Sequence, residues 1–336
     1  MPIESPENRF KEIKEPITID KTDRKILYAL DLNRRATYSE IGKKVRLSKQ
    51  SVKERISNLE KIGVIRQYFA LIDVHRMGYT FYRIDLKLQN ITELKEKYII
   101  NYILKLLKVI SVLELHGKYD LAVLFLTKDI IETDNNIRNI KWKFNEYIKD
   151  TSFSVITTHT RYKYGFLIDK KQEDKEIFMG RELADIKLSP VENKVLTTLG
   201  WHGRMPLTKI AKQLGKSISS IKNAIKNLKD KKILLGYTTL IAAQMLGYLH
   251  YKVFINFQNP SQEKERKLEY YFRVNPNIIY KTKSLGRSDI ECEIIVKSIA
   301  EFKNIVREMQ YGFSDLIKDI DFYLVLDQLD TSYYPV

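Results

Sequence analysis

The feature of this chain that most constrains its fold is an internal repeat. When the 336-residue sequence is compared with itself at an offset of 169 residues, its two halves align without a gap. The match begins near Asp23 and Glu192 and still holds at "GKYD" (117–120) and "GRSD" (286–289). Each copy is too long to be one repeat of a solenoid, so we predict two tandem copies of one composite unit.

The first part of each unit has the pattern of three short helices. In the first copy the apolar spacing predicts helices over 20–32, 37–45 and 48–63. Val52, Ile56 and Leu59 share one face of the third helix, with Ser48 as a suitable N-cap and Gly63 as a natural end. Three such helices with tight joints are typical of a helix-turn-helix, and the residues that follow predict an extended wing. In the second copy Lys232 replaces Gly63, so we expect that helix to end differently.

The polar face of the third helix carries side chains that can bond base edges and phosphates. The candidate DNA-binding residues are Ser48, Lys49, Gln50, Lys53, Glu54 and Ser57 in the first copy, and Lys216, Ser217, Ser219, Lys222, Asn223 and Lys226 in the second. The alternative is an ordinary solvated helix face, which is what such residues form in most helices. The three-helix context and the repetition of the pattern favour the DNA-binding interpretation.

Positive charge is concentrated in the two segments that hold these helices. Residues 19–66 contain 13 Lys and Arg against 6 Asp and Glu, and residues 188–235 contain 10 against 2. These segments therefore carry +15 of the net charge of +16. A general bias toward lysine would spread charge along the chain, so its concentration indicates a nucleic-acid partner, which we take to be double-stranded DNA.

The second part of each unit alternates strands and helices. "TFYRIDLKLQN" at 80–90 alternates apolar and polar residues and predicts a half-buried strand. The further elements predicted for the first copy are a helix at 92–107, strands at 109–116 and 121–127, a helix at 130–148 and a strand at 153–159. The order βαββαβ is the ferredoxin-like arrangement. Its helices cover one face of the sheet, so we expect the other face to pair with a second sheet.

Composition favours a cytoplasmic protein without a membrane segment. The only cysteine is Cys292, which excludes a disulfide framework, and the N-terminal residues do not form a secretory signal. The apolar stretch 234–257 is long enough for a membrane helix. Its counterpart in the first copy is charged, however, and residues 250–258 alternate like a strand.

The whole pattern resembles the Lrp/AsnC family of feast/famine transcriptional regulators. The matching stretches are "DRKILYALDLNRRATYSEIGKKVRLSKQSVKERISNLEKIGVI" and "HGKYDLAVLF". Both copies resemble the family, so the resemblance covers nearly the whole chain. It is close in the first copy and looser in the second. It implies a sequence-specific DNA-binding regulator that acts as a dimer or a larger assembly. It also implies that an amino acid or a related effector binds near a G-x-x-D turn.

The resemblance places the effector turn at two positions of this chain. The candidate residues are His116, Gly117, Lys118, Tyr119 and Asp120 in the first copy, and Gly286, Arg287, Ser288 and Asp289 in the second. Gly and Asp are also good turn residues without any ligand, which is the alternative. The family's dimer is expected to form within one chain, as an intrachain pseudo-dimer of the two sheet domains, with further homo-oligomers as an option. Two non-identical reading helices suit an asymmetric DNA site better than a perfect palindrome.

We therefore predict an α+β protein with two winged helix-turn-helix domains and two ferredoxin-like βαββαβ domains in tandem. The expected parts are a flexible arm (1–18), the first winged helix-turn-helix (19–72), the first effector and dimerisation domain (78–160), a linker (161–187), the second winged helix-turn-helix (188–241) and the second effector and dimerisation domain (247–329).

No catalytic pattern is visible. Metal-ligand spacing is absent from the five histidines, which are His75, His116, His159, His202 and His250. The chain also lacks a Gly-rich phosphate loop and a nucleophile elbow, so we predict no enzymatic activity, no cofactor and no metal site. Two alternatives remain. One is an enzyme resembling the tandem sirohaem decarboxylases, which share this architecture. The other is an effector-binding or scaffold module whose second helix-turn-helix no longer reads DNA.

Overall fold

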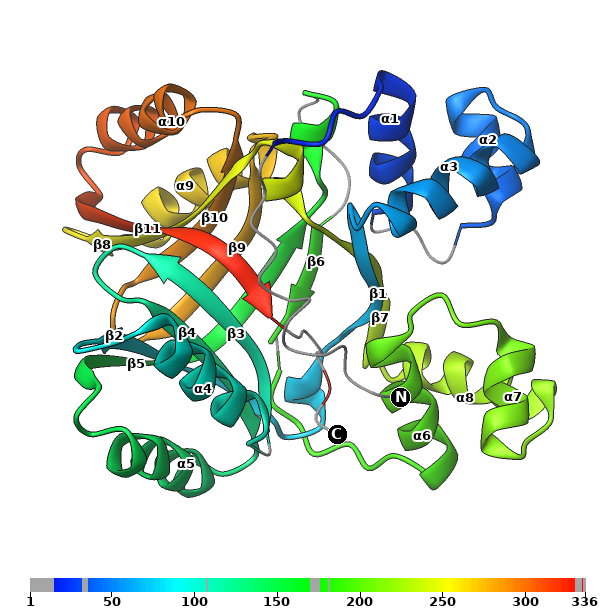
Figure 1. The fold of residues 1–336 in the computed structure, drawn as a ribbon, viewed down its shortest axis with the longest axis horizontal. Coiled ribbons are helices and arrows are strands. Elements are labelled where there is room, and N and C mark those ends of the chain that lie inside the picture. Colours follow the sequence, from blue (N-terminus) through cyan, green and yellow to red (C-terminus); the bar gives the residue numbers. More distant parts are fainter. Residues whose placement is uncertain are drawn as a thin grey trace.

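The computed structural model describes residues 15–31, 36–106, 108–169, 176–180, 182–329 and 334. Most of the predicted N-terminal arm lies outside these residues. Within them, two units of the same element order follow one another along the chain, each with a helical part and a sheet part (Figure 1). The α+β fold with helix-turn-helix and ferredoxin-like domains is confirmed.

Each unit begins with a head, by which we mean three helices and the strand that follows them. The first head comprises α1 (Lys21–Leu30), α2 (Tyr38–Val45), α3 (Lys49–Lys61) and β1 (Ile65–Ile72), and the second comprises α6 (Pro190–Trp201), α7 (Leu207–Leu214), α8 (Ile218–Asp230) and β7 (Leu234–Ile241). Thr37 caps α2 in a capping box with Glu40, while Ser48 and Ser217 cap α3 and α8. These caps explain why the helices start where the sequence predicts.

The two reading helices, α3 and α8, end in the same backbone conformation. Gly63 has a φ of +80°, and Lys232 at the equivalent position has a φ of +54°, so both lie in the left-handed region. The Ile233 amide donates to the Leu228 carbonyl at 3.0 Å, which satisfies the end of the helix. The expectation of a different ending is therefore wrong for the backbone conformation, because lysine accepts the left-handed region at an energetic cost.

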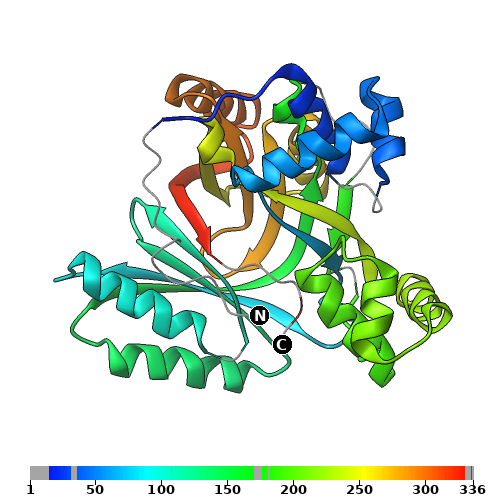
Figure 2. The ribbon, with the colours of Figure 1, turned by 45° about the vertical axis from the view of Figure 1, so that its right-hand side comes forward.

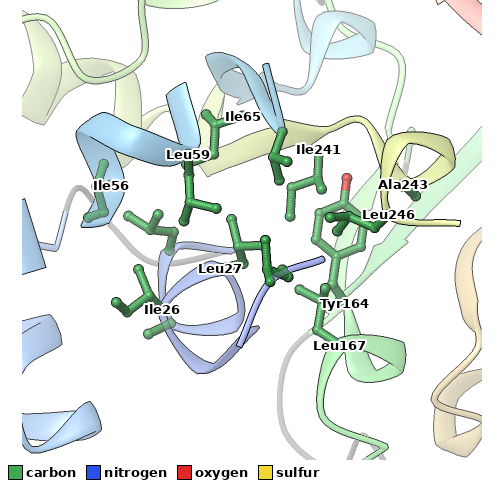
Figure 3. Packing of buried hydrophobic residues seen from close by; sticks show 14 of the residues in the cluster. Ile26, Leu27, Ile56, Leu59, Ile65, Tyr164, Leu167, Ile241, Ala243 and Leu246 are labelled. Carbon is green, nitrogen blue, oxygen red and sulfur yellow. The ribbon is translucent and has the colours of Figure 1, made fainter. Parts of the chain in front are cut away.

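The core of the first head includes residues from distant parts of the chain. Ile26 and Leu27 of α1 face Ile56 and Leu59 of α3 (Figure 3). Residues from outside the head also join this core, among them Tyr164, Leu167, Ile241, Ala243 and Leu246. Part of the segment predicted as a linker (161–187) is therefore structured, with η3 (Gly165–Leu167) in this core and β6 (Glu176–Met179) paired with β5. This segment lacks a periodic pattern because a few apolar residues, and not one face of a helix or strand, pack against the core.

The two sheet domains have the predicted βαββαβ order. The first contains β2 (Thr80–Leu88), α4 (Glu93–Leu104), β3 (Val109–His116), β4 (Leu121–Thr127), α5 (Ile130–Lys143) and β5 (Ile148–Tyr162), after η2 (Val74–Arg76). The second contains β8 (Leu249–Phe257), α9 (Gln262–Val274), β9 (Ile278–Leu285), β10 (Ile290–Val296), α10 (Ile299–Gly312) and β11 (Ile317–Leu329), after η4 (Ala243–Leu246). Each pair of helices covers the outer face of its own sheet (Figure 1).

The two sheets join into one closed ring of strands. The order is β2-β4-β3-β11-β8-β10-β9-β5, and β5 pairs back with β2. In the two joins between units, His116 lies opposite Leu324, and Leu285 lies opposite Val155. These pairs are equivalent at the offset of 169 residues. The chain therefore pairs its own two sheet domains with approximate two-fold symmetry, as expected for an intrachain pseudo-dimer. We call the closed ring the joint barrel.

Closure of the barrel corrects the prediction of a half-buried strand at 80–90 and agrees with the expected pairing of the two sheets. Arg83 and Asp85, on the polar face of that strand, are each 1% exposed. Tyr82, Ile84 and Leu86 face the helices, so Arg83 and Asp85 point into the barrel, between the two sheets. Alternation along one strand shows that its two faces differ, but it does not show what covers the second face.

The predicted wing of each head pairs with the wing of the other. β1 and β7 form a two-stranded antiparallel ribbon in which Phe69 lies opposite Thr238, its own equivalent in the second copy. The two-fold relation of the sheet domains thus extends to the heads.

Candidate nucleic-acid interface

The polar faces of the two reading helices are open to solvent. All twelve residues proposed from the sequence to bind DNA are exposed on α3, on α8 or at the residues that precede them. The opposite faces are buried, through Val52, Ile56 and Leu59 in α3 and through Ile221 and Leu228 in α8. Neither polar face packs against the sheet domains. Each helix can therefore approach a large flat or convex partner.

Ser48 and Ser217 also have a structural role. The Ser48 hydroxyl accepts a hydrogen bond from the Ser51 amide at 3.0 Å, and Ser217 accepts from Ser220 at 3.1 Å. Each hydroxyl therefore fixes the start of its helix, where the free backbone amides and the helix dipole favour an anion. Lys49 and Lys216 stand beside these helix starts and add positive charge.

The exposed faces of the two reading helices differ in charge. In α3 the Gln50 amide donates to the Glu54 carboxylate at 2.7 Å, so these two side chains already bond each other on the exposed face. In α8 the corresponding positions are Ser219 and Asn223, and the face carries no acidic residue between Lys216 and Lys229. The exposed face proposed to bind DNA is therefore more positive in the second head than in the first.

Both heads lie on the same side of the molecule, opposite the four helices of the sheet domains (Figures 1 and 2). Contacts across the ribbon hold the heads together. The Gly203 amide donates to the Tyr68 carbonyl at 2.7 Å, and a Cβ on Gly203 would lie 2.9 Å from the Phe69 backbone. The Arg204 guanidinium lies over the rings of Tyr38 and Tyr68, 5.4 and 5.1 Å from their centres. These contacts limit independent movement of the heads.

Other exposed cations near α3 were not identified from the sequence. Lys43 and Lys44 lie in the last turn of α2, and Arg46 forms the joint between α2 and α3 with a φ of +59°. Lys43 and Lys44 could have been noticed in the sequence as cations near the predicted reading helix. Cations are favoured in the last turn of any helix, however, so their presence there does not by itself indicate DNA binding.

The two predicted effector turns lie where the units meet. A Cβ on Gly117 would lie 3.1 Å from the Tyr323 ring, and one on Gly286 would lie 2.4 Å from the Phe153 carbonyl oxygen. Each turn therefore packs against a strand of the other unit. His116, Gly117 and Lys118 are exposed.

The aspartates of these turns have structural partners. Asp120 accepts from the Leu88 amide at 2.6 Å and from Lys87 at 2.9 Å. In the second copy Asp289 accepts from the Phe257 amide at 2.7 Å. Both carboxylates hold their turns against a neighbouring strand, as the turn-residue alternative predicts for them.

A buried ionic cluster fills part of the joint barrel. Arg83 donates to both oxygens of Glu291, at 2.6 and 2.9 Å, and its Nε lies 3.1 Å from Asp85. Lys252 lies 3.1 Å from both Glu291 and Glu293. Burial alone would raise the pKa of Glu291, but Arg83 and Lys252 overcome it and hold that pKa at about 2. Because Arg83 and Glu291 belong to different units, this pair ties the two sheet domains together.

Comparison with known proteins identifies the family of this chain. Residues 19–66 match the family model for winged helix-turn-helix DNA-binding domains. An uncharacterized HTH-type transcriptional regulator of Pyrococcus furiosus is 31% identical over 134 residues, which cover 40% of this chain and 84% of that protein. This chain belongs to the Lrp/AsnC family of transcriptional regulators. The HTH-type transcriptional regulator FL11 of Pyrococcus horikoshii is 29% identical over 119 residues, or 35% of this Lrp/AsnC chain and 78% of FL11.

A second comparison concerns the fold of the whole Lrp/AsnC chain. The crystal structure of the siroheme decarboxylase NirDL superposes with a TM-score of 0.59 over 93% of each chain, at 13% sequence identity. The likeness shows that the complete arrangement of two heads and two sheet domains occurs in another solved protein. Among the residues described for this Lrp/AsnC protein, no helix is long and apolar enough to cross a membrane.

Proposed function

We propose that this regulator binds double-stranded DNA with both heads at once and reads an asymmetric site. The observation that supports this most strongly is the exposure of both polar helix faces on the same side of one molecule. The ribbon between β1 and β7 relates the two heads by approximate two-fold symmetry, as two half-sites on one face of a duplex require.

We further propose separate roles for residues on the reading helices. Phosphates are contacted by Lys49, by Lys216 and by the backbone amides at the start of each reading helix. These contacts set the position of each helix in the major groove. Residues further along each face then meet base edges. Glu54 can accept from the amino group of cytosine, while Asn223 has the two-sided geometry that suits adenine. Because these two residues are equivalent in the repeat, the two heads prefer different half-sites.

The test is a footprint on sites selected from random duplex DNA. We expect protection of two adjacent half-sites of different sequence, one beneath each head. Equal protection of two identical half-sites in a perfect palindrome would contradict asymmetric reading.

An amino-acid-like effector is a second part of the proposal, for the turn at 116–120. His116, Gly117 and Lys118 are exposed there at the boundary between the units, where a small ligand can alter how the units pack. The footprint repeated with each of the twenty amino acids in turn tests this part, and a pattern that none of them changes would contradict it.

A sirohaem-decarboxylase-like enzyme is the second candidate function, favoured by the likeness to NirDL over nearly the whole chain. Against it, charged pairs fill part of the joint barrel, and burial lowers the pKa of His159 to about 4, which keeps that imidazole neutral. Titration with an iron uroporphyrin, followed by absorbance, distinguishes the two. We expect no saturable spectral change, and saturable tetrapyrrole binding by a protein that ignores duplex DNA would reverse the choice.

A further inference from the structure

One side chain of the second effector turn is enclosed in the way that a bound ligand would be. The Arg287 guanidinium carbon lies 4.0 Å from the centre of the Phe254 ring, 4.3 Å from Tyr323 and 5.3 Å from Tyr119. Its Nη2 lies 2.6 Å from the Asp321 carboxylate, and only 10% of its side chain is exposed. Three aromatic faces and a carboxylate are the surroundings that proteins build for a guanidinium or ammonium ligand.

We call this enclosure the cation cage, formed by Asp85, Tyr119, Phe254, Asp321 and Tyr323. Both units contribute, since Asp85 and Tyr119 come from the first and the other three from the second. The Asp85 carboxylate lies 3.5 Å from Arg287 Nη1 on the side facing the barrel. The Tyr323 hydroxyl is buried and has no hydrogen-bond partner among the described residues, so the cage also offers a polar group that Arg287 leaves unused.

The equivalent place in the other half of the pseudo-dimer is not a cage. The repeat puts Ser288 at the position of Tyr119, Ser154 at that of Tyr323 and Asp85 at that of Phe254, so all three aromatic walls are lost there. Lys118, the equivalent of Arg287, is exposed. The enclosure is therefore particular to one of two related sites and does not follow from the fold alone.

We propose that the cation cage is a guanidinium-binding site and that Arg287 is its built-in ligand. Removal of the Arg287 side chain opens the site to a small free guanidinium compound. For the intact protein, the consequence is that the turn at 286–289 is closed to an effector, while the turn at 116–120 stays open. This consequence rests on the proposed effector function, whereas the cage itself does not.

The experiment measures thermal unfolding of the full chain with methylguanidinium chloride as the probe, at constant ionic strength adjusted with sodium chloride. Arg287→Ala is expected to melt below the wild-type protein. Methylguanidinium at about ten times its dissociation constant is expected to raise the Tm of this variant by about 2–4 °C, in a saturable manner. The wild-type protein and Lys118→Ala, the matched control at the equivalent position, are expected to show no such rise.

Two further measurements complete the test. Arg287→Ala combined with Asp321→Asn is expected to lose most of the response, because the carboxylate that holds the guanidinium is gone. If Arg287→Ala does not fold, the yield of folded protein on refolding is expected to rise with methylguanidinium and not with sodium chloride. A response of Arg287→Ala no larger than that of the wild-type protein and Lys118→Ala, or no gain in refolding yield, would overturn the proposal. None of these readouts uses DNA, so the result is separate from the test of DNA binding.

Discussion

Replacing Glu291 with glutamine is expected to lower the free energy of unfolding by about 3–5 kcal/mol, the largest effect of any single change considered for this chain. The side chain keeps its size but loses its charge, so Arg83 and Lys252 keep positive charges in a site that excludes water. Arg83 is 1% exposed and Lys252 is 5% exposed. Chemical denaturation followed by circular dichroism measures the effect.

A surface ion pair provides the control for this prediction. Glu93 and Lys97 pair on the exposed side of α4, and Glu93 keeps 79% of its side chain exposed. Glu93→Gln is expected to leave the stability almost unchanged, because water already screens this exposed pair. The double variant Arg83→Met with Glu291→Gln is expected to cost less than the sum of its two single changes, because each single change removes one half of the pair and leaves the other half buried. Strictly additive effects would show that the two residues do not act as a pair.

The second large effect is expected on DNA affinity. The double variant Lys53→Ala with Lys222→Ala removes one exposed cation from the equivalent position of each reading helix. If each lysine contacts one phosphate, binding at 0.15 M salt is expected to weaken about 30-fold. Fluorescence anisotropy with a selected duplex measures this loss. Lys141→Ala with Lys303→Ala is the matched control, because both of those lysines are exposed on sheet-domain helices, and it is expected to bind as the wild-type protein does.

The single variants distinguish two competent heads from one. Lys53→Ala and Lys222→Ala are each expected to weaken binding about fivefold. A chain whose affinity falls for Lys53→Ala but not for Lys222→Ala would have only one reading head. That outcome would favour the alternative in which the second helix-turn-helix no longer contacts DNA.

Local patterns predicted most of the helices and strands. The strands at 109–116 and 121–127 were predicted with the bounds that the structure has, because short turns separate them from their neighbours. The third helix begins at Lys49, directly after the predicted N-cap Ser48, because that serine caps it. The exposed face of α3 also followed from the sequence, since the buried positions Val52, Ile56 and Leu59 fix the rotation of the helix.

Features that depend on contacts between residues far apart in the sequence could not be predicted from local patterns. Arg83 and Asp85 alternate with apolar residues as solvent-facing positions do, and only the closure of the barrel by the second unit buries them. The core contribution of Tyr164 and Leu167 has no periodic signal, because they lie in a short irregular segment. Arg287 was predicted as part of an effector turn, but its enclosure depends on Phe254 and Tyr323 from two other strands.

The salt dependence of DNA binding tests the central claim most directly. The logarithm of the association constant is plotted against the logarithm of salt concentration for the wild-type protein, for Lys53→Ala with Lys222→Ala, and for Lys141→Ala with Lys303→Ala. Contact of both heads with one duplex predicts that the slope of the first double variant is shallower by about 1.8 than that of the other two proteins. The same slope for all three proteins would contradict contact between DNA and the exposed faces of α3 and α8.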